Sequence, residues 1–260
     1  MDENKKPVIL LTNDDGIHSL SWKYMMDLLS EWADAVAIVP EYEQSGKAIS
    51  ITLNEPLRIR KHEDRLFSTN GTPADCINLG ISIILEGKKP DIIVSGINKG
   101  LNIAQDLLYS GPFGAALAGY TKGIVSFALS LDYKKDGIYA DYLKASELCN
   151  GIVSEIINRI KQPYLYNVNL PFDSRYYTKD RVRITRLGCR EYEDLVIMRK
   201  DPRNRPYYWY SGNKQKIRHD ELSDICMIKK GYISITPLKA LSIDENALGE
   251  LSGIFNGAMK

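Results

Sequence analysis

The sequence has 260 residues, 44% of them hydrophobic and 26% charged, which allows a substantial buried core and is ordinary for a globular protein. Lys and Arg total 34 against 33 Asp and Glu, so no net positive field would collect nucleic acid or an anionic membrane. The cysteines form no C-x-x-C pair, which argues against a zinc site and a dense disulfide framework. The N-terminal run MDENKKPVILL fits neither a signal peptide nor a membrane span, so we expect a cytoplasmic protein.

The first half of the chain alternates buried-strand and helix patterns. Continuous apolar runs at 8–11, 35–39 and 92–94 predict strands that are covered on both faces. Between the first two runs, apolar residues recur at helical spacing over 21–32 after a serine cap. This pattern predicts a first βαβ unit.

The alternation continues beyond this unit. Thr72 supplies a capping hydroxyl, Pro73 suits the first helical position and Asp75 lies in the first turn, so a second helix should begin here. The pattern then predicts a small-residue helix at 110–120, a strand at 125–131 and a long amphipathic helix at 139–160. Strands that alternate with helices indicate an α/β sandwich with a mostly parallel sheet.

From residue 164 onwards the pattern changes. LYNVNLP, VRITRLG and YISITPL are strand-like segments without intervening helical patterns. The basic and aromatic stretch RKDPRNRPYYWYSG, at 199–212, predicts an exposed hairpin or arm that serves oligomerisation or substrate entry. A weaker interpretation is that its aromatic and cationic side chains stack on nucleic-acid bases. We expect one domain with a β-rich C-terminal extension, and no nucleic acid as partner.

Polar loops follow several of the predicted strands. Asp14 and Asp15 come directly after the first strand, where open α/β sheets bind ligands, and two adjacent carboxylates suit a hard dication. Taken alone, Asp-Asp-Gly is as consistent with a solvated turn. A phosphorelay receiver also carries an acidic pair here, but its phosphoacceptor aspartate is missing, because the third strand ends in Ser95-Gly96.

Three further loops should face the same crevice. Ser45 and Gly46 follow the second strand in a sequence that lacks the first glycine of a P-loop. Asn98 offers an amide oxygen to a cation, and Asn102 lies in a glycine-rich stretch able to form an anion nest. Ser110 and Gly111 precede a helix N-terminus, which favours phosphate. Each signal is weak separately, but together they predict a cation and phosphate site.

These segments together make the chain resemble the SurE family, the survival-protein nucleotidases, over nearly its whole length. The resemblance lies in ILLTNDDGI, QSGKAISITLNEPLR, NGTPADCINLG, PDIIVSGINKGLN, the YSG before the small-residue helix, YNVNLP and GYISITPL. Several separate motifs in the right order are much harder to obtain by chance than one.

The resemblance implies a fold, an activity and a site. The fold would be a Rossmann-like three-layer sandwich, with its core at 1–135 and a helix and β-rich extension carrying an oligomerisation arm at 136–260. The activity would be hydrolysis of nucleoside monophosphates at the 5' or 3' position, in some members also of short polyphosphate, by a homodimer or homotetramer. Mg²⁺ or Mn²⁺ would be held by Asp14, Asp15, Ser45 and Asn98, and the phosphate would be surrounded by Gly46, Asn102, Ser110 and Gly111. Our own hypothesis is that Asp14 or Asp15 is also catalytic, as the base that activates water.

Two departures from the family pattern affect the phosphate side. Pro112 stands where many members have threonine and removes a hydroxyl and a backbone donor. Glu43 replaces the usual asparagine and adds negative charge beside a site for an anion. The alternative interpretation is therefore a catalytically impaired protein that binds metal and nucleotide or phosphate.

Overall fold

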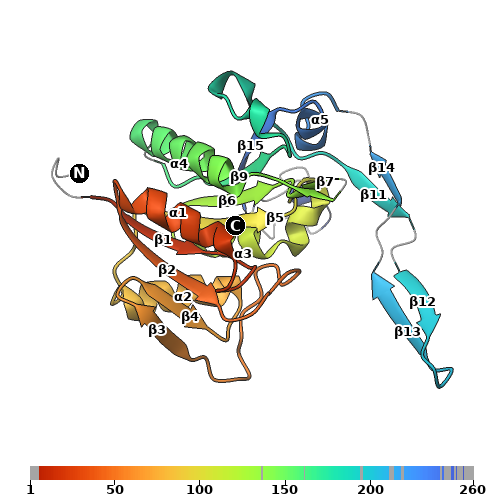
Figure 1. The fold of residues 1–260 in the computed structure, drawn as a ribbon, viewed down its shortest axis with the longest axis horizontal. Helices are drawn as coiled ribbons and strands as arrows, with labels where there is room; N and C mark the ends of the chain where they lie inside the picture. The colour runs from red at the N-terminus through yellow and green to blue at the C-terminus, as the bar shows by residue number, and fades with distance from the viewer. Residues whose placement is uncertain are drawn as a thin grey trace.

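A mostly parallel sheet forms the centre of the protein in the computed structural model, which describes residues 6–135, 137–160, 162–193, 196–210, 214–217 and 220–240, with residues 242, 247, 248, 250 and 254. The strands of the sheet are β1 (Val8–Thr12), β2 (Asp34–Pro40), β3 (Ile59–Glu63), β4 (Leu66–Thr69), β5 (Ile92–Lys99), β6 (Val125–Leu131), β9 (Leu165–Leu170), β10 (Val182–Ile184) and β15 (Ile233–Leu238). Their spatial order is β10-β15-β9-β6-β5-β1-β2-β4-β3, and only the β15–β9 and β3–β4 pairs within it are antiparallel (Figure 1).

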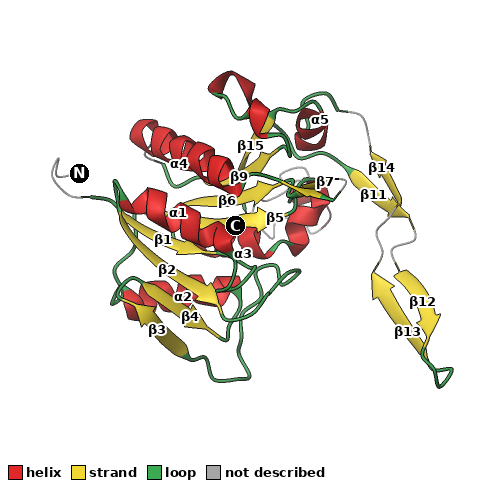
Figure 2. Cartoon of the chain, in the orientation of Figure 1, coloured by secondary structure: helices red, strands yellow, loops and turns green. Residues whose placement is uncertain are grey.

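Helices cover both faces of this sheet (Figure 2). One face packs against α1 (Leu20–Ser30) and α4 (Tyr142–Arg159), and the other packs against α2 (Pro73–Leu79) and α3 (Gly111–Tyr120). The central strands are buried on both sides, as their continuous apolar sequences require. This three-layer α/β arrangement confirms the predicted fold class.

Short-range signals set the helix boundaries. The Thr72 hydroxyl accepts the Asp75 N–H at 3.1 Å and the Asp75 carboxylate accepts the Thr72 N–H at 3.0 Å, which completes the predicted capping box. The helix expected at 139–160 begins later, at Tyr142, because Asp141 caps it. The residues just before form a short hairpin of β7 (Lys134–Lys135) and β8 (Ile138–Tyr139).

The sequence patterns missed some elements. The antiparallel edge pair β3–β4 was not expected, and α5 (Asp224–Lys229) lies in the half where no helix was expected. Short irregular helices also occur, namely the π-helix η1 (Gly80–Ile84) and the 3₁₀ helices η2 (Ala104–Tyr109), η3 (Ser174–Tyr176) and η4 (Lys179–Arg181). Within the described part of the chain, none of the helices has the length and apolar character needed to cross a bilayer.

An arm of two short hairpin-like sheets projects from the sandwich (Figure 1). At its base β11 (Arg190–Glu193) pairs with β14 (Lys214–Ile217), and further out β12 (Val196–Lys200) pairs with β13 (Pro206–Tyr210). The predicted exposed hairpin is confirmed in β12–β13, while Ser211 and Gly212 lie outside the described residues. The role of the arm in oligomerisation and the boundary at residue 135 stay predictions.

Candidate active site

The carboxyl ends of β1 and β5 open into a crevice of about 270 Å³. Two walls enclose it, which we call the β5 wall (98–106) and the loop wall (43–50). Seven of the eight residues predicted for the site line this crevice: Asp14, Ser45, Gly46, Asn98, Asn102, Ser110 and Gly111. The eighth, Asp15, follows Asp14 in the chain. The polar loops at separate strand ends therefore do converge.

The acidic pair lies where β1 meets the loop wall. Asp14 is 3% exposed and Asp15 is half-buried. Gly16 turns the chain with a φ of +84°, and a Cβ there would lie 3.0 Å from the Tyr42 carbonyl carbon. The Asp14 carbonyl oxygen accepts the N–H of Gln44 at 2.7 Å, which ties the acidic loop to the loop wall. Glycine at position 16 thus permits the close approach of the two loops.

The electrostatics of the pair favour a bound cation. Burial, followed by the neighbouring negative charges of Asp15 and Glu43, raises the pKa of Asp14 to about 7, although the Lys99 ammonium acts in the opposite direction. Burial also raises the pKa of Asp15. The Asp14 Oδ1 atom is buried and has no hydrogen-bond partner among the described residues. An oxygen-binding dication would satisfy this atom and offset the repulsion within the pair.

The available donor atoms restrict the kind of metal. The described residues contain no group of three or more His, Cys, Asp and Glu side chains placed to hold an ion. A cation at Asp14 would therefore depend on neutral oxygens from neighbouring loops as well as on the two carboxylates. This set suits Mg²⁺ or Mn²⁺ and does not suit a zinc site built from thiolates and imidazoles.

Asn98 projects from the irregular end of β5. The pairing of β5 with β6 shifts register between Ser95 and Asn98, and such bulges re-aim side chains. The Asn98 amide nitrogen donates to the Gly100 carbonyl oxygen at 2.8 Å, which fixes the orientation of the carboxamide. Its other end, the amide oxygen, is the atom suited to a cation.

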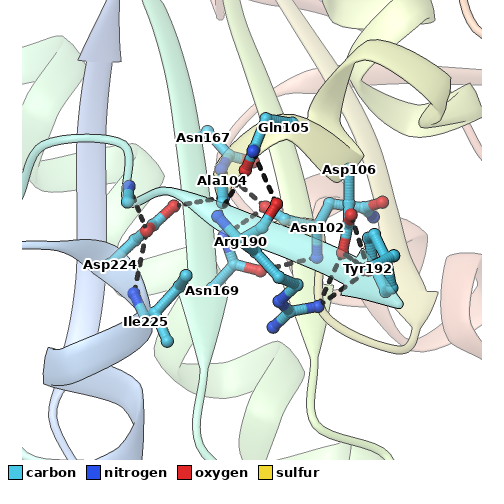
Figure 3. A network of polar contacts seen from close by, with 11 residues as sticks. Asn102, Ala104, Gln105, Asp106, Asn167, Asn169, Arg190, Tyr192, Asp224 and Ile225 are labelled. Carbon is cyan, nitrogen blue, oxygen red and sulfur yellow. Dashed lines mark hydrogen bonds and ion pairs between the residues drawn. The ribbon is translucent and has the colours of Figure 1, made fainter. Parts of the chain in front are cut away.

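Asn102 is held by residues of the neighbouring strands (Figure 3). Its N–H donates to Asn169 Oδ1 at 2.9 Å, and its carbonyl oxygen accepts from the amide nitrogens of Asn167 and Asn169. Its own amide nitrogen donates to the Ser130 hydroxyl at 2.8 Å. The strands β6 and β9 therefore fix the position of this part of the β5 wall.

The N-terminus of α3 closes the crevice. The Ser110 hydroxyl accepts the Phe113 N–H at 3.1 Å and so caps the helix. A Cβ on Gly111 would lie 2.8 Å from the Cβ of Asp14, so only glycine allows this approach. Since Pro112 has no N–H and that of Phe113 is used by the cap, the Gly111 N–H is the donor that this turn can offer to an anion.

The loop wall is more open. Ser45 and Gly46 are exposed, and Gly46 has a φ of +74°. The Ser45 hydroxyl donates to Glu43 Oε1 at 2.8 Å. Glu43, which departs from the family pattern, thus holds the hydroxyl that was predicted to bind the cation.

Comparisons with known proteins identify the family of this chain. The family model of the survival protein SurE matches residues 9–194. The chain belongs to the SurE family. It is 41% identical over 255 residues to the 5'-nucleotidase SurE of Caldanaerobacter subterraneus subsp. tengcongensis, covering 95% of this chain and 97% of the relative. It is 36% identical to the 5'-nucleotidase SurE of Aquifex aeolicus, covering 89% and 92%. The crystal structure of the SurE protein from Aquifex aeolicus superposes with a TM-score of 0.82 at 31% identity, covering 96% of this chain and all of that one.

The sequence patterns did not identify several residues that line or support this crevice. Of the described residues that line the crevice, Lys99 alone carries a positive charge. Its position between Asn98 and Gly100, in a loop already assigned to the site, could have identified it. Asp106 also lines the crevice, where it accepts hydrogen bonds from Arg190 at 2.7 Å and from Tyr192 (Figure 3). No local pattern links these two partners to Asp106, because they lie on β11.

Proposed function

We propose that this chain is a phosphatase that hydrolyses nucleoside monophosphates and depends on a divalent cation. The observation that carries the proposal is the buried Asp14 beside Asp15, with an orphaned carboxylate oxygen, at a crevice between strand ends. The names of the SurE relatives, 5'-nucleotidases, support the substrate class and a preference for the 5' position. Hydrolysis at the 3' position and hydrolysis of short polyphosphate would be additional activities of the same site.

The residues divide into two groups in this proposal. Oxygen atoms of Asp14, Asp15, Ser45 and Asn98 would hold Mg²⁺ or Mn²⁺. The backbone of Gly46 and Gly111, together with Asn102 and Ser110, would surround the phosphate. When bound, the cation would supply charge that polarises the phosphoryl group and activates water.

The chain itself would position the substrate and accept a proton. The β5 wall, fixed through Asn102, orients the phosphate so that a water can attack in line with the leaving oxygen. A carboxylate of the acidic pair takes the proton of that water. Lys99 lies near the same carboxylates and contributes positive charge toward the dianionic substrate.

Phosphate release tests the proposal against the alternative of an impaired binding protein. We expect purified protein to release phosphate from adenosine 5'-monophosphate with Mn²⁺ or Mg²⁺, and to stop when a chelator removes the metal. Asp14→Ala should lower kcat/KM by about a hundredfold or more, because a charged oxygen ligand is lost. Asp27→Ala, an exposed aspartate on α1, is the matched control and should change nothing. A wild type that binds Mn²⁺ and nucleotide without releasing phosphate would favour the impaired binding protein.

A further inference from the structure

A second cavity, of about 800 Å³, lies beside the crevice and shares Leu101 with it. Asp132, at the end of β6, and Phe172, just beyond β9, line this second cavity. Since β5, β6 and β9 are adjacent and parallel, their carboxyl ends lie along one edge of the sheet. The two cavities are therefore neighbours along the edge where α/β proteins bind ligands.

The lining of the second cavity is amphiphilic. Leu101, Ile103 and Ile225 line it and belong to one apolar cluster, which we call the apolar floor, and Phe172 adds an aromatic ring to the lining. Polar lining comes from charged side chains: Asp132, Asp173, Arg175, Arg190, Lys229 and Lys230. Pockets with apolar walls and a few polar groups, in this range of volume, bind small organic ligands. Inorganic phosphate alone would leave the apolar floor without a partner.

Arg190 lies at the boundary between the two cavities. Its side chain is 14% exposed, and its Nη1 donates to Asp106, a residue of the crevice, at 2.7 Å and to the Tyr192 hydroxyl at 3.1 Å (Figure 3). Its buried Nε has no hydrogen-bond partner in the part of the chain that the structure describes. A buried guanidinium donor without a partner is costly, and an acceptor atom on a ligand would satisfy it.

Two other cavities are less suitable. A cavity of about 560 Å³ next to α1 and the β3–β4 edge shares no lining residue with the crevice. A cavity of about 370 Å³ near α3 has an almost entirely apolar lining, which offers little to a sugar. Of the large cavities, the 800 Å³ one combines a shared wall with the crevice, an aromatic ring and hydrogen-bonding groups.

We infer that the second cavity holds the base and sugar of a nucleoside monophosphate whose phosphate lies in the crevice. The inference rests on the proposed function for its substrate class. Phe172 and the apolar floor would contact the base, and Arg190 would donate to an acceptor atom of the nucleoside. Lys229 and Lys230, both exposed at this cavity, add positive charge that favours an anionic ligand.

Kinetics with two substrates test the contact with the base. Phe172→Ala should raise the KM for adenosine 5'-monophosphate by about tenfold, because an aromatic contact with the base is lost. The KM for ribose 5-phosphate, which has no base, should stay unchanged. If the alanine variant fails to fold, Phe172→Leu keeps most of the side-chain volume and replaces it. It should also raise the ratio of the KM for adenosine 5'-monophosphate to the KM for ribose 5-phosphate. Phe67→Ala, at a half-buried phenylalanine outside both cavities, is the matched control and should not change the ratio. Equal effects on both substrates, or no effect on either, would overturn the inference.

Photolabelling locates the base without requiring turnover. With 8-azidoadenosine 5'-monophosphate and Mn²⁺, we expect the label on peptides that contain Phe172 or Ile228. Label near His18 and Arg60, which line the 560 Å³ cavity, or no specific label, would contradict the inference. Label at Phe172 in a protein that releases no phosphate would instead refute the proposed hydrolysis and leave the nucleoside site standing.

Discussion

Asn102, on the β5 wall, takes part in four hydrogen bonds with side chains of β6 and β9, whereas Ser45, on the loop wall, is exposed and donates to Glu43. The loop wall is joined to the rest of the site through backbone contacts, from Gln44 N–H to Asp14 and from Ala48 N–H to Tyr109. One wall is thus fixed by buried side chains of the sheet, and the other lies over the crevice with its tip in solvent. The fixed wall suits orientation of the phosphate, and the open wall suits entry and exit of ligands.

Removal of the support beneath the β5 wall should have the largest effect on stability. Asn169→Ala leaves the Asn102 N–H buried without an acceptor, and we expect the free energy of unfolding to fall by about 2–4 kcal/mol. Urea denaturation measures this change. Asn78→Ala, on α2 away from the crevice, is the control. If Asn169→Ala unfolds like the wild type, the β5 wall is not held in the way described.

The loop wall depends on close packing against α3. A Cβ on Gly114 would lie 1.9 Å from the Ala48 carbonyl oxygen, so Gly114→Ala should displace the loop and destabilise the protein by about 1–3 kcal/mol. The matched control is Gly151→Ala within α4, where nothing lies within 4 Å of the added Cβ. That control should stabilise by about 0.5–1 kcal/mol, because alanine favours the helix. Thermal unfolding of the pair gives the comparison, and equal shifts would contradict it.

A single charge on the β5 wall should affect substrate binding. Lys99→Ala should raise the KM for adenosine 5'-monophosphate by about three- to tenfold, because the crevice loses its cationic side chain. Lys47→Ala removes an exposed lysine that does not line the crevice and should have little effect. Initial rates at two salt concentrations measure both variants. The wild-type advantage should shrink as salt increases, and a salt-independent difference would argue against an electrostatic role.

The negative charge of Glu43, on the loop wall, should have the smallest effect on the KM, and its removal should lower the KM instead of raising it. Glu43→Gln removes a negative charge near the phosphate position, while the amide oxygen of the new side chain can still accept from Ser45, so the KM should fall by about twofold. Glu55→Gln, in an exposed loop, is the control. A rise in KM would mean that the Glu43 charge assists the cation more than it repels the substrate.

The sequence allowed prediction of the core because its signals are local. Buried strands such as β1 and β2 read as continuous apolar runs, and the capping box at Thr72 begins α2 as expected. The edge strand β3 is largely exposed and charged, so it lacks the pattern of a buried strand. The helix α5 has six residues, too few for a helical period to be recognised.

In the candidate site, too, some residues could be predicted from the sequence and others could not. Asp14, Asn98 and Ser110 were identified from strand ends and from a family resemblance, and they do line one crevice. Their supports could not be predicted, because the residues that hold the β5 wall lie 28 to 120 positions away in sequence. Asn169 looked like an ordinary strand residue, and only the pairing of β6 with β9 places it next to Asn102. Roles for the site residues stay predictions.

Asp224, the first residue of α5, clamps the β5 wall by accepting a backbone N–H, and this clamp can form only late in synthesis. Asp224 accepts the N–H of Ala104, which lies 120 residues earlier, and also those of Gly188 and Ile225 (Figure 3). A growing chain on the ribosome exposes Asp14 early, but it lacks this clamp until α5 has left the exit tunnel. The first βαβ unit can begin to fold during synthesis, while the crevice reaches its final form only near the end of translation. An incomplete chain should therefore have no functional crevice.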